Sequence, residues 1–160
     1  MDKLSRREFV VTASAAALAG AASPSFAAPA PGAQRVFVGS GTPDGILAFD
    51  WHSATGELTP AGVAAKISTV DWITFSPGRE FMYAAAEVDS FNGKPTGEVA
   101  SFSVSGGKLA PLSAQNSASP GTCHVALDQT GRVLLSADYG GGAAAPVTLC
   151  QGRREMRRQI

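Results

Sequence analysis

A short apolar run, a turn and a second apolar run recur in the same order along this 160-residue chain. The segments "RVFVGSG", "REFMYAA" and "RVLLSAD" begin at Arg35, Arg79 and Arg132, and the last two follow the similar lead-ins "WITFSPG" and "HVALDQTG". Each lead-in, turn and second run predicts a β-hairpin. A further repeated pair, "GILAFDWHSATGELTP" and "GEVASFSVSGGKLAPL", begins at Gly45 and Gly97 and predicts a second hairpin in each period. The apolar runs are too short for helices, so we expect an all-β chain.

Two hairpins per period place four strands in roughly 45 to 53 residues, which suits the four-stranded blade of a β-propeller. A β-sandwich with regular turns is the alternative. It does not explain why the same strand–turn–strand unit returns with the same partner segments. The shared position of the three arginines predicts a structural role for Arg132.

The N-terminus carries the pattern of an export signal. "SRREF", which begins at Ser5, resembles the twin-arginine motif, and an Ala-rich stretch and small residues for cleavage near Ala27 follow in the right order. The apolar stretch is shorter than the roughly 20 residues that a membrane-spanning helix needs. A surface helix with two chance arginines is the alternative. We expect residues 1–27 to be a signal peptide, residues 28–33 a linker, and the mature protein to be periplasmic or otherwise exported, without a stable membrane anchor.

Two motifs within residues 34–142 carry a family resemblance. A strand followed by a Thr-Gly turn runs from Asp50 to Leu58, and a histidine, a hairpin and a glycine-ended strand follow from Gly121 to Gly142. In this order they resemble the N-terminal blades of the lactonase-type seven-bladed propellers, which include the propeller 6-phosphogluconolactonases and carboxy-muconate cyclases. The second match rests on His124, Asp128, Gly131, Arg132, Ala137, Asp138, Tyr139 and Gly140. The resemblance implies about two to three blades of a seven-bladed ring, apparently truncated.

His124 is the candidate catalytic residue. The resemblance implies that loops at the starts of certain strands line a central pocket, where a neutral imidazole acts as a general base or orients water at a lactone carbonyl. Family members often carry another histidine where this chain has Thr122. In related enzymes, arginine and glutamate residues from later blades share the pocket. The alternative for His124 is a structural histidine bonded to a loop carbonyl.

The last residues contrast with the rest in charge. Residues 28–150 hold six basic and ten acidic side chains, whereas residues 151–160 hold four arginines and one glutamate. We expect residues 143–160 to be a non-propeller tail, produced by a frameshifted or truncated reading frame. A basic tail that binds an acidic partner is the alternative.

The function implied by the resemblance is hydrolysis of a small-molecule sugar lactone, such as 6-phosphogluconolactone, with the fragment itself inactive. Phosphosugars are cytoplasmic metabolites, so an exported member is expected to act on another lactone. The alternative is a non-enzymatic exported propeller that binds a ligand or protein partner, because propellers host both kinds of function. A formal net charge of zero gives no basic nucleic-acid surface, and no residue spacing indicates a cofactor or metal site.

The remaining chemistry-bearing residues are expected to serve the fold. We expect Asp138 to bond to backbone in a neighbouring turn, with a pocket-lining role as the alternative. The glycines at 140–142 indicate a bulge or turn rather than a phosphate loop, because no helix or Lys-Ser/Thr pair follows. Trp51 and Trp72 are expected to pack between blades, with stacking on a sugar ring as the alternative. His52 is expected to be solvated, and no disulfide is expected between Cys123 and Cys150.

Overall fold

The computed structural model describes residue 29, residues 31–149 and residues 156–157. Within them the chain forms β-strands and no helix, as the all-β expectation requires. The signal peptide expected at residues 1–27 and Cys150 lie outside the described residues. The strands are β1 (Ala33–Gly39), β2 (Ile46–His52), β3 (Glu57–Ala65), β4 (Val70–Phe75), β5 (Phe81–Ala86), β6 (Glu98–Ser105), β7 (Lys108–Asn116), β8 (Thr122–Leu127), β9 (Val133–Asp138), β10 (Ala143–Leu149) and β11 (Met156–Arg157).

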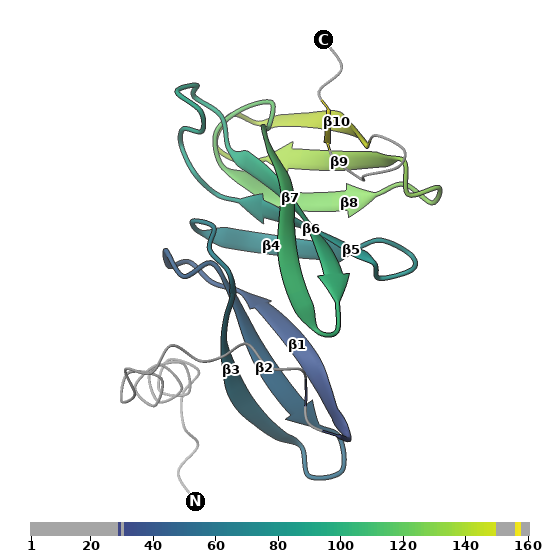
Figure 1. Ribbon diagram of the computed structural model, residues 1–160. Coiled ribbons are helices and arrows are strands. Elements are labelled where there is room, and N and C mark those ends of the chain that lie inside the picture. Colours follow the sequence, from purple (N-terminus) through teal and green to yellow (C-terminus); the bar gives the residue numbers. More distant parts are fainter. Residues whose placement is uncertain (1–28, 30, 150–155, 158–160) are drawn as a thin grey trace, which may run out of the picture.

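These strands form three antiparallel sheets in which neighbours in the sequence are neighbours in space. The first sheet has the order β1-β2-β3, the second β4-β5-β6-β7, and the third β8-β9-β10-β11. Figure 1 shows them in succession, with the second sheet between the first and the third. The two four-stranded meanders, stacked with the three-stranded first sheet, have the blade arrangement that the repeat predicts.

The second sheet is buried on both faces because each face packs against a different neighbour. On β5, Met82 and Ala84 belong to the core shared with the first sheet, and Tyr83 and Ala85 belong to the core shared with the third. All four side chains are 0% exposed. A strand covered on both faces reads as a continuous apolar run, which explains "FMYAAA".

The turns between β4 and β5 and between β8 and β9 correct the alignment of the arginines. The Ser76 N–H donates to the Phe81 carbonyl, and the Asp128 N–H donates to the Val133 carbonyl, so these residues correspond. Arg79 then occupies the position of Gly131, and both have left-handed backbones, with φ of 57° and 65°. Arg132 therefore corresponds to Glu80 and not to Arg79, because the turns superpose one residue out of step with the sequence alignment.

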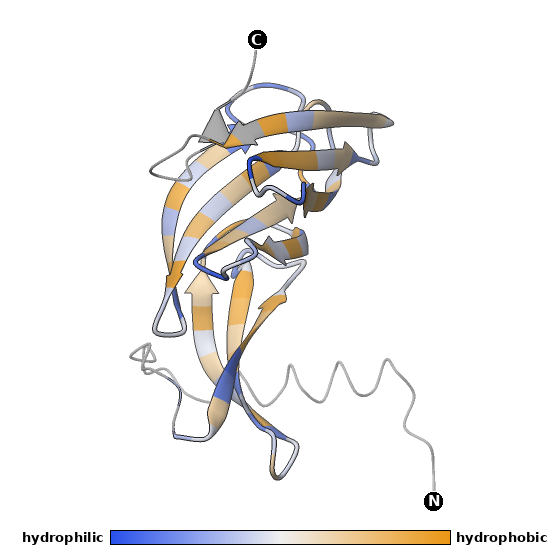
Figure 2. Cartoon of the chain, turned by 90° about the vertical axis from the view of Figure 1, so that its right-hand side faces the viewer, coloured by the Kyte–Doolittle hydropathy of each residue, from blue (hydrophilic) through white to orange (hydrophobic). Residues whose placement is uncertain are grey.

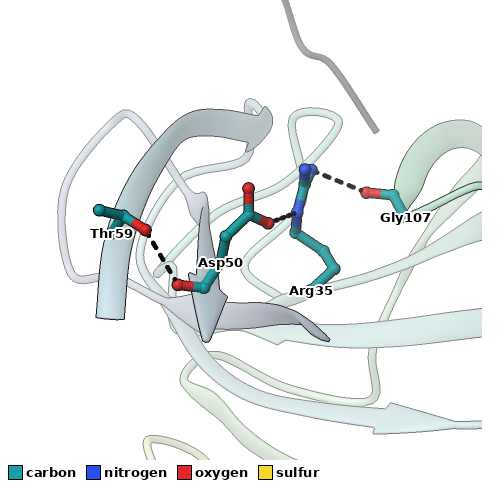
Figure 3. A network of polar contacts seen from close by, with 4 residues as sticks. All are labelled: Arg35, Asp50, Thr59 and Gly107. Carbon is teal, nitrogen blue, oxygen red and sulfur yellow. Dashed lines mark hydrogen bonds and ion pairs between the residues drawn. The ribbon is translucent and has the colours of Figure 1, made fainter. Parts of the chain in front are cut away.

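Arg35 ties the first sheet to the second. Its Nε donates to Asp50 Oδ1 at 2.7 Å, and its Nη1 donates to the Gly107 carbonyl at 3.0 Å, in the turn between β6 and β7 (Figure 3). The Thr59 hydroxyl donates to the Asp50 carbonyl at 3.2 Å, which joins β3 to the same group of residues. The Arg35 side chain is only 5% exposed, so the ion pair lies between the sheets rather than on the surface.

The expectation that the propeller segment ends at residue 142 is wrong for residues 143–149. These residues form β10, which pairs with β9 from Ala143 opposite Asp138 to Thr148 opposite Val133. Val147 and Leu149 are buried in the core shared with the second sheet. The sequence shows no alternation of apolar and polar residues here, because alanine and proline stand between the buried positions. The segment forms a strand because the free edge of β9 offers it a pairing partner.

Candidate functional site

The first strands of the second and third sheets carry the same irregularity. On β4, Val70 pairs with Ala86 and Trp72 with Ala85, which leaves Asp71 as an extra residue. On β8, Thr122 pairs with Asp138 and His124 with Ala137, which leaves Cys123 as an extra residue. A bulge of this kind re-aims the side chains beside it and is common next to active sites. Trp72 and His124 therefore occupy equivalent positions, each directly after a bulge.

The two equivalent side chains meet. The indole ring of Trp72 and the imidazole ring of His124 lie with centroids 4.4 Å apart and planes inclined at 41°. Trp72 is 46% exposed, and His124 is half-buried. None of the described residues forms a hydrogen bond with the His124 imidazole. An aromatic face and a titratable ring with free nitrogens therefore stand together where the first strands of two sheets lie side by side.

Sequence reasoning missed this pair, although a signal was present. Trp72 begins "WITFSPG" and His124 begins "HVALDQTG", so the repeat already placed them at the same position. The expectation that Trp72 packs between blades describes only part of its surroundings, because nearly half of its surface is open.

Asp138 holds the loop that leads into β8. One carboxylate oxygen accepts the N–H groups of Ala118 and Ser119, both at 3.0 Å, and the other accepts the Thr122 hydroxyl at 2.7 Å. The Asp138 side chain is 2% exposed and Thr122 is 0% exposed. The structure thus places Asp138 in the structural role expected for it. Its effect on the site is indirect, because the loop it holds sets where β8 and His124 begin.

Glycines allow the same loop to approach the end of β9 closely. A Cβ atom on Gly121, whose φ is +74°, would lie 2.8 Å from the Gly140 nitrogen. A Cβ on Gly140 would lie 2.9 Å from the Pro120 carbonyl oxygen. The Tyr139 N–H donates to the Gly121 carbonyl at 2.7 Å across this contact. These glycines are part of a backbone junction, as expected for a turn.

The other candidate residues lie apart from His124 or serve local structure. Cys123 is a free, half-buried thiol whose Sγ lies 3.5 Å from the Ala137 carbonyl oxygen. His52 ends β2 in the first sheet, opposite Glu57. Arg132 is exposed next to the turn that follows β8. Among the described residues, no hydrogen bond or ring contact links these side chains to the Trp72–His124 pair.

A cavity of about 280 Å³ lies elsewhere, where the β3–β4 connection meets the second sheet. Its lining is mostly apolar and includes Lys66 and Glu98, and burial raises the pKa of the Glu98 carboxyl. It contains neither Trp72 nor His124. Across the described ranges no group of histidine, cysteine or carboxylate side chains is arranged to hold a metal ion. The same ranges contain no helix with the length and apolar character needed to span a membrane.

Comparison with solved structures supports the fold. A protein from Bacteroides fragilis assigned as a 6-phosphogluconolactonase aligns with a TM-score of 0.66 at 22% identity, over 78% of this chain and 35% of that one. A Bacteroides uniformis protein with the same assignment gives 0.65 at 24%, over 76% and 35%. The periplasmic gluconolactonase of Pseudomonas aeruginosa gives 0.67 at 21%, over 77% and 36%. The chain therefore spans about a third of the length of these structures.

A search of curated protein sequences found no match. The model of the family described as "Lactonase, 7-bladed beta-propeller" matches residues 35–159. This match covers the repeat, the two bulged strands, His124 and the strand β10 that sequence reasoning had placed outside the blade. The three sheets are accordingly consecutive blades of a propeller rather than layers of a sandwich. The chain belongs to the seven-bladed β-propeller family of lactonases.

Proposed function

We propose that the propeller represented by this chain hydrolyses a sugar lactone and that His124 acts as its general base. The observation that carries the proposal is the position of His124 within a chain of the lactonase family. It follows a bulge on the first strand of its sheet, has no hydrogen-bond partner among the described residues, and lies beside the exposed indole of Trp72.

The proposed reaction needs one proton acceptor and one water molecule. The imidazole of His124 takes a proton from water as the oxygen attacks the lactone carbonyl carbon. The tetrahedral intermediate then collapses with cleavage of the ring C–O bond, and the imidazolium gives its proton to the departing oxygen, which yields the hydroxy acid and the neutral imidazole. General base assistance of this kind contributes roughly 10² to 10⁴ in rate when the substrate is correctly placed. A neutral imidazole suits the task because one of its ring nitrogens carries a lone pair that can accept the proton.

Trp72 is proposed to form the wall against which the substrate ring rests. Its indole is 46% exposed and its ring centroid is 4.4 Å from that of His124. Binding pockets combine aromatic walls with a few polar groups that orient the ligand. The C–H face of a sugar lactone on Trp72 would bring the carbonyl carbon within reach of a water held by His124.

The 160-residue chain by itself is expected to lack appreciable lactonase activity. Lactone hydrolysis also needs groups that position the substrate and stabilise the developing oxyanion. The Trp72–His124 pair supplies neither an arginine nor a backbone oxyanion hole. The chain covers about a third of the structures it resembles, so we propose that other blades of a complete ring supply those groups.

The experiment compares proton release from glucono-lactone and 6-phosphogluconolactone for three proteins. These are the 160-residue chain, a seven-bladed protein that joins this chain to the remaining blades of a lactonase-family propeller, and the His124→Ala variant of that protein. The completed protein should hydrolyse at least one lactone, and His124→Ala should lose most of that activity. His52→Ala is the matched control, because His52 lies in the first sheet and should leave the rate unchanged.

Three results would contradict the proposal. Full activity from the 160-residue chain would show that no further blades are needed. An unaffected and folded His124→Ala variant would return this residue to a structural role. A completed protein that binds lactones without hydrolysing them would favour the non-enzymatic alternative.

We further propose that the protein is exported by the twin-arginine route. The support is the "SRREF" motif and the apolar stretch and small residues behind it. Changing Arg6 and Arg7 together to lysine should abolish translocation, and the mature N-terminus should lie near Ala28. Fractionation and N-terminal sequencing check this, and uncleaved protein in the cytoplasm of a host with an intact pathway would refute it.

A further inference from the structure

The cavity of about 280 Å³ is formed where the first sheet packs on the second. Its lining comes from the β3–β4 connection and from β6 and β7. Ile67, Ala100 and Phe102 line it and also belong to the core shared by these two sheets. The hydrogen bond from Arg35 to the Gly107 carbonyl fastens the same two sheets to each other. Both sheets are described, so the cavity does not depend on any blade outside this chain. We name it the joint cavity.

The walls of the joint cavity are mostly apolar. Ile67 and Phe102 are buried, Leu112 and Ala114 are half-buried, and Pro111 is exposed. Apolar bands recur along the strands of both sheets in Figure 2. A cavity of about 150 Å³ is large enough to hold benzene, whereas drug-sized ligands occupy roughly 300–1,000 Å³. The joint cavity therefore fits a ligand that has one small apolar group and few other atoms.

Two side chains of opposite charge interrupt the apolar walls. Lys66 is exposed in the β3–β4 connection, and Glu98 is half-buried at the start of β6. The one ion pair among the described residues joins Arg35 to Asp50, so Lys66 and Glu98 do not pair with each other. Within the part of the chain that the structure describes, neither charged group forms a hydrogen bond. Both charges are therefore available to a ligand.

The Glu98 carboxylate is poorly compensated in the protein alone. Burial raises the pKa of this carboxyl, because apolar surroundings disfavour the ionised form. A partly buried charge is normally paired with a group of opposite charge, and a carboxyl perturbed by burial in a cavity is a candidate for a binding site. A ligand ammonium group would supply the missing partner of Glu98. A ligand carboxylate would do the same for Lys66.

We propose that the joint cavity binds a small zwitterion with an apolar side group, of which an apolar α-amino acid is the simplest kind. The ligand ammonium pairs with Glu98, the ligand carboxylate pairs with Lys66, and the side group rests on the apolar walls. A cation alone is repelled by Lys66 and an anion alone by Glu98, so only a ligand with both charges complements the cavity. The site is separate from the Trp72–His124 pair and does not rest on lactonase activity.

NMR spectra of the isotope-labelled 160-residue chain test this proposal with L-phenylalanine as the probe. Phenethylamine, which lacks the carboxylate, and hydrocinnamate, which lacks the ammonium group, serve as analogues. L-Phenylalanine should shift the backbone amide signals of Ile67, Glu98 and Ala114 saturably, because these residues line the cavity. Each analogue should bind about tenfold more weakly or worse, because one charge-assisted hydrogen bond is missing and a like charge opposes the other.

Two variants remove the charges one at a time. Glu98→Gln and Lys66→Met should each weaken L-phenylalanine binding by about tenfold or more. Lys66→Met should instead strengthen phenethylamine binding, and Glu98→Gln should strengthen hydrocinnamate binding, because each removes a like-charge repulsion. Lys66 is exposed and glutamine has the shape of glutamate, so both variants should fold, which circular dichroism checks. Lys108→Met and Glu57→Gln are matched controls outside the cavity and should bind L-phenylalanine as the unmodified chain does.

Four results would overturn the proposal. The first is the absence of saturable shifts at the cavity amides up to the solubility limit of L-phenylalanine. The second is a set of shifts centred on Trp72 and His124 instead. The third is an analogue that binds as tightly as L-phenylalanine, which would show that only one charge or the apolar walls matter. The fourth is unchanged L-phenylalanine binding in a folded Glu98→Gln or Lys66→Met variant.

Discussion

Replacing Asp138 tests whether one carboxylate organises the loop before β8. Its oxygens accept hydrogen bonds from two backbone N–H groups, of Ala118 and Ser119, and from the Thr122 hydroxyl. In Asp138→Ala all three donors lose their acceptor. Thr122 is 0% exposed, so water cannot replace the carboxylate there, whereas the half-buried loop allows some hydration of the two N–H groups.

The expected magnitudes follow from these partners. A buried donor left without an acceptor costs about 1–3 kcal/mol, and contributions that share one group are not additive. We therefore expect Asp138→Ala to lower the free energy of unfolding by about 3–4 kcal/mol. Asp138→Asn keeps one oxygen for the two N–H groups, and its amide can donate to the Thr122 oxygen. We expect this variant to lose only about 1 kcal/mol.

Urea unfolding followed by circular dichroism separates the two variants. With a slope of about 2 kcal/mol per molar urea, the midpoint should fall by roughly 1.5–2 M for Asp138→Ala and about 0.5 M for Asp138→Asn. All proteins are compared at one concentration, so that association does not contribute to the difference. A loss below about 1 kcal/mol for Asp138→Ala, or equal losses for the two variants, would refute the reasoning.

Three further predictions concern stability and its pH dependence. Arg35→Met should cost about 1–3 kcal/mol in urea unfolding, because it leaves the Asp50 carboxylate and the Gly107 carbonyl without their cation; a neutral result would contradict the bridging role of Arg35. Hydrogen bonds from the Thr130 side chain and the Val133 backbone are the main causes that lower the pKa of Asp128 to about 2. The ionised carboxylate therefore stabilises the folded state fully above the unfolded-state pKa, and this contribution is lost as the pH falls from about 4 to 2. Asp128→Asn should flatten unfolding stability over that range, and an unchanged pH profile would contradict this. Burial raises the pKa of Glu98, so its ionised form opposes folding at neutral pH and this cost disappears as the pH falls through the folded-state pKa. Glu98→Gln should therefore stabilise the protein at pH 7 but not at pH 4, which paired urea titrations measure.

Much of the fold follows from local patterns in the sequence. The order of apolar runs and turns predicted the hairpins, and the spacing of the two hairpin types predicted the four-stranded sheet of a propeller blade. Even the equivalence of Trp72 and His124 is present in the aligned lead-ins. These features can be read from sequence because strand alternation and turn chemistry depend on residues only a few positions apart.

The sequence could not show where those local units meet. The repeated arginines are out of step in space because the backbone places Arg79 where the next turn has Gly131. The segment "AAAPVTL" shows no clear alternation, yet it becomes β10 because β9 offers an edge. Such outcomes depend on pairing with a partner rather than on the segment alone.

The sequence by itself determined the all-β class, the blade repeat, the family resemblance and His124 as the candidate residue. Only the tertiary structure decided that Trp72 lies 4.4 Å from the His124 ring, that Asp138 holds the loop before β8, and that Arg35 bonds to Gly107, 72 positions away. The bulges on β4 and β8 place the two rings, and the packing of the first sheet on the second brings Arg35 to Gly107. A contact between sheets depends on the register and relative placement of whole strands, which no short segment of the sequence encodes.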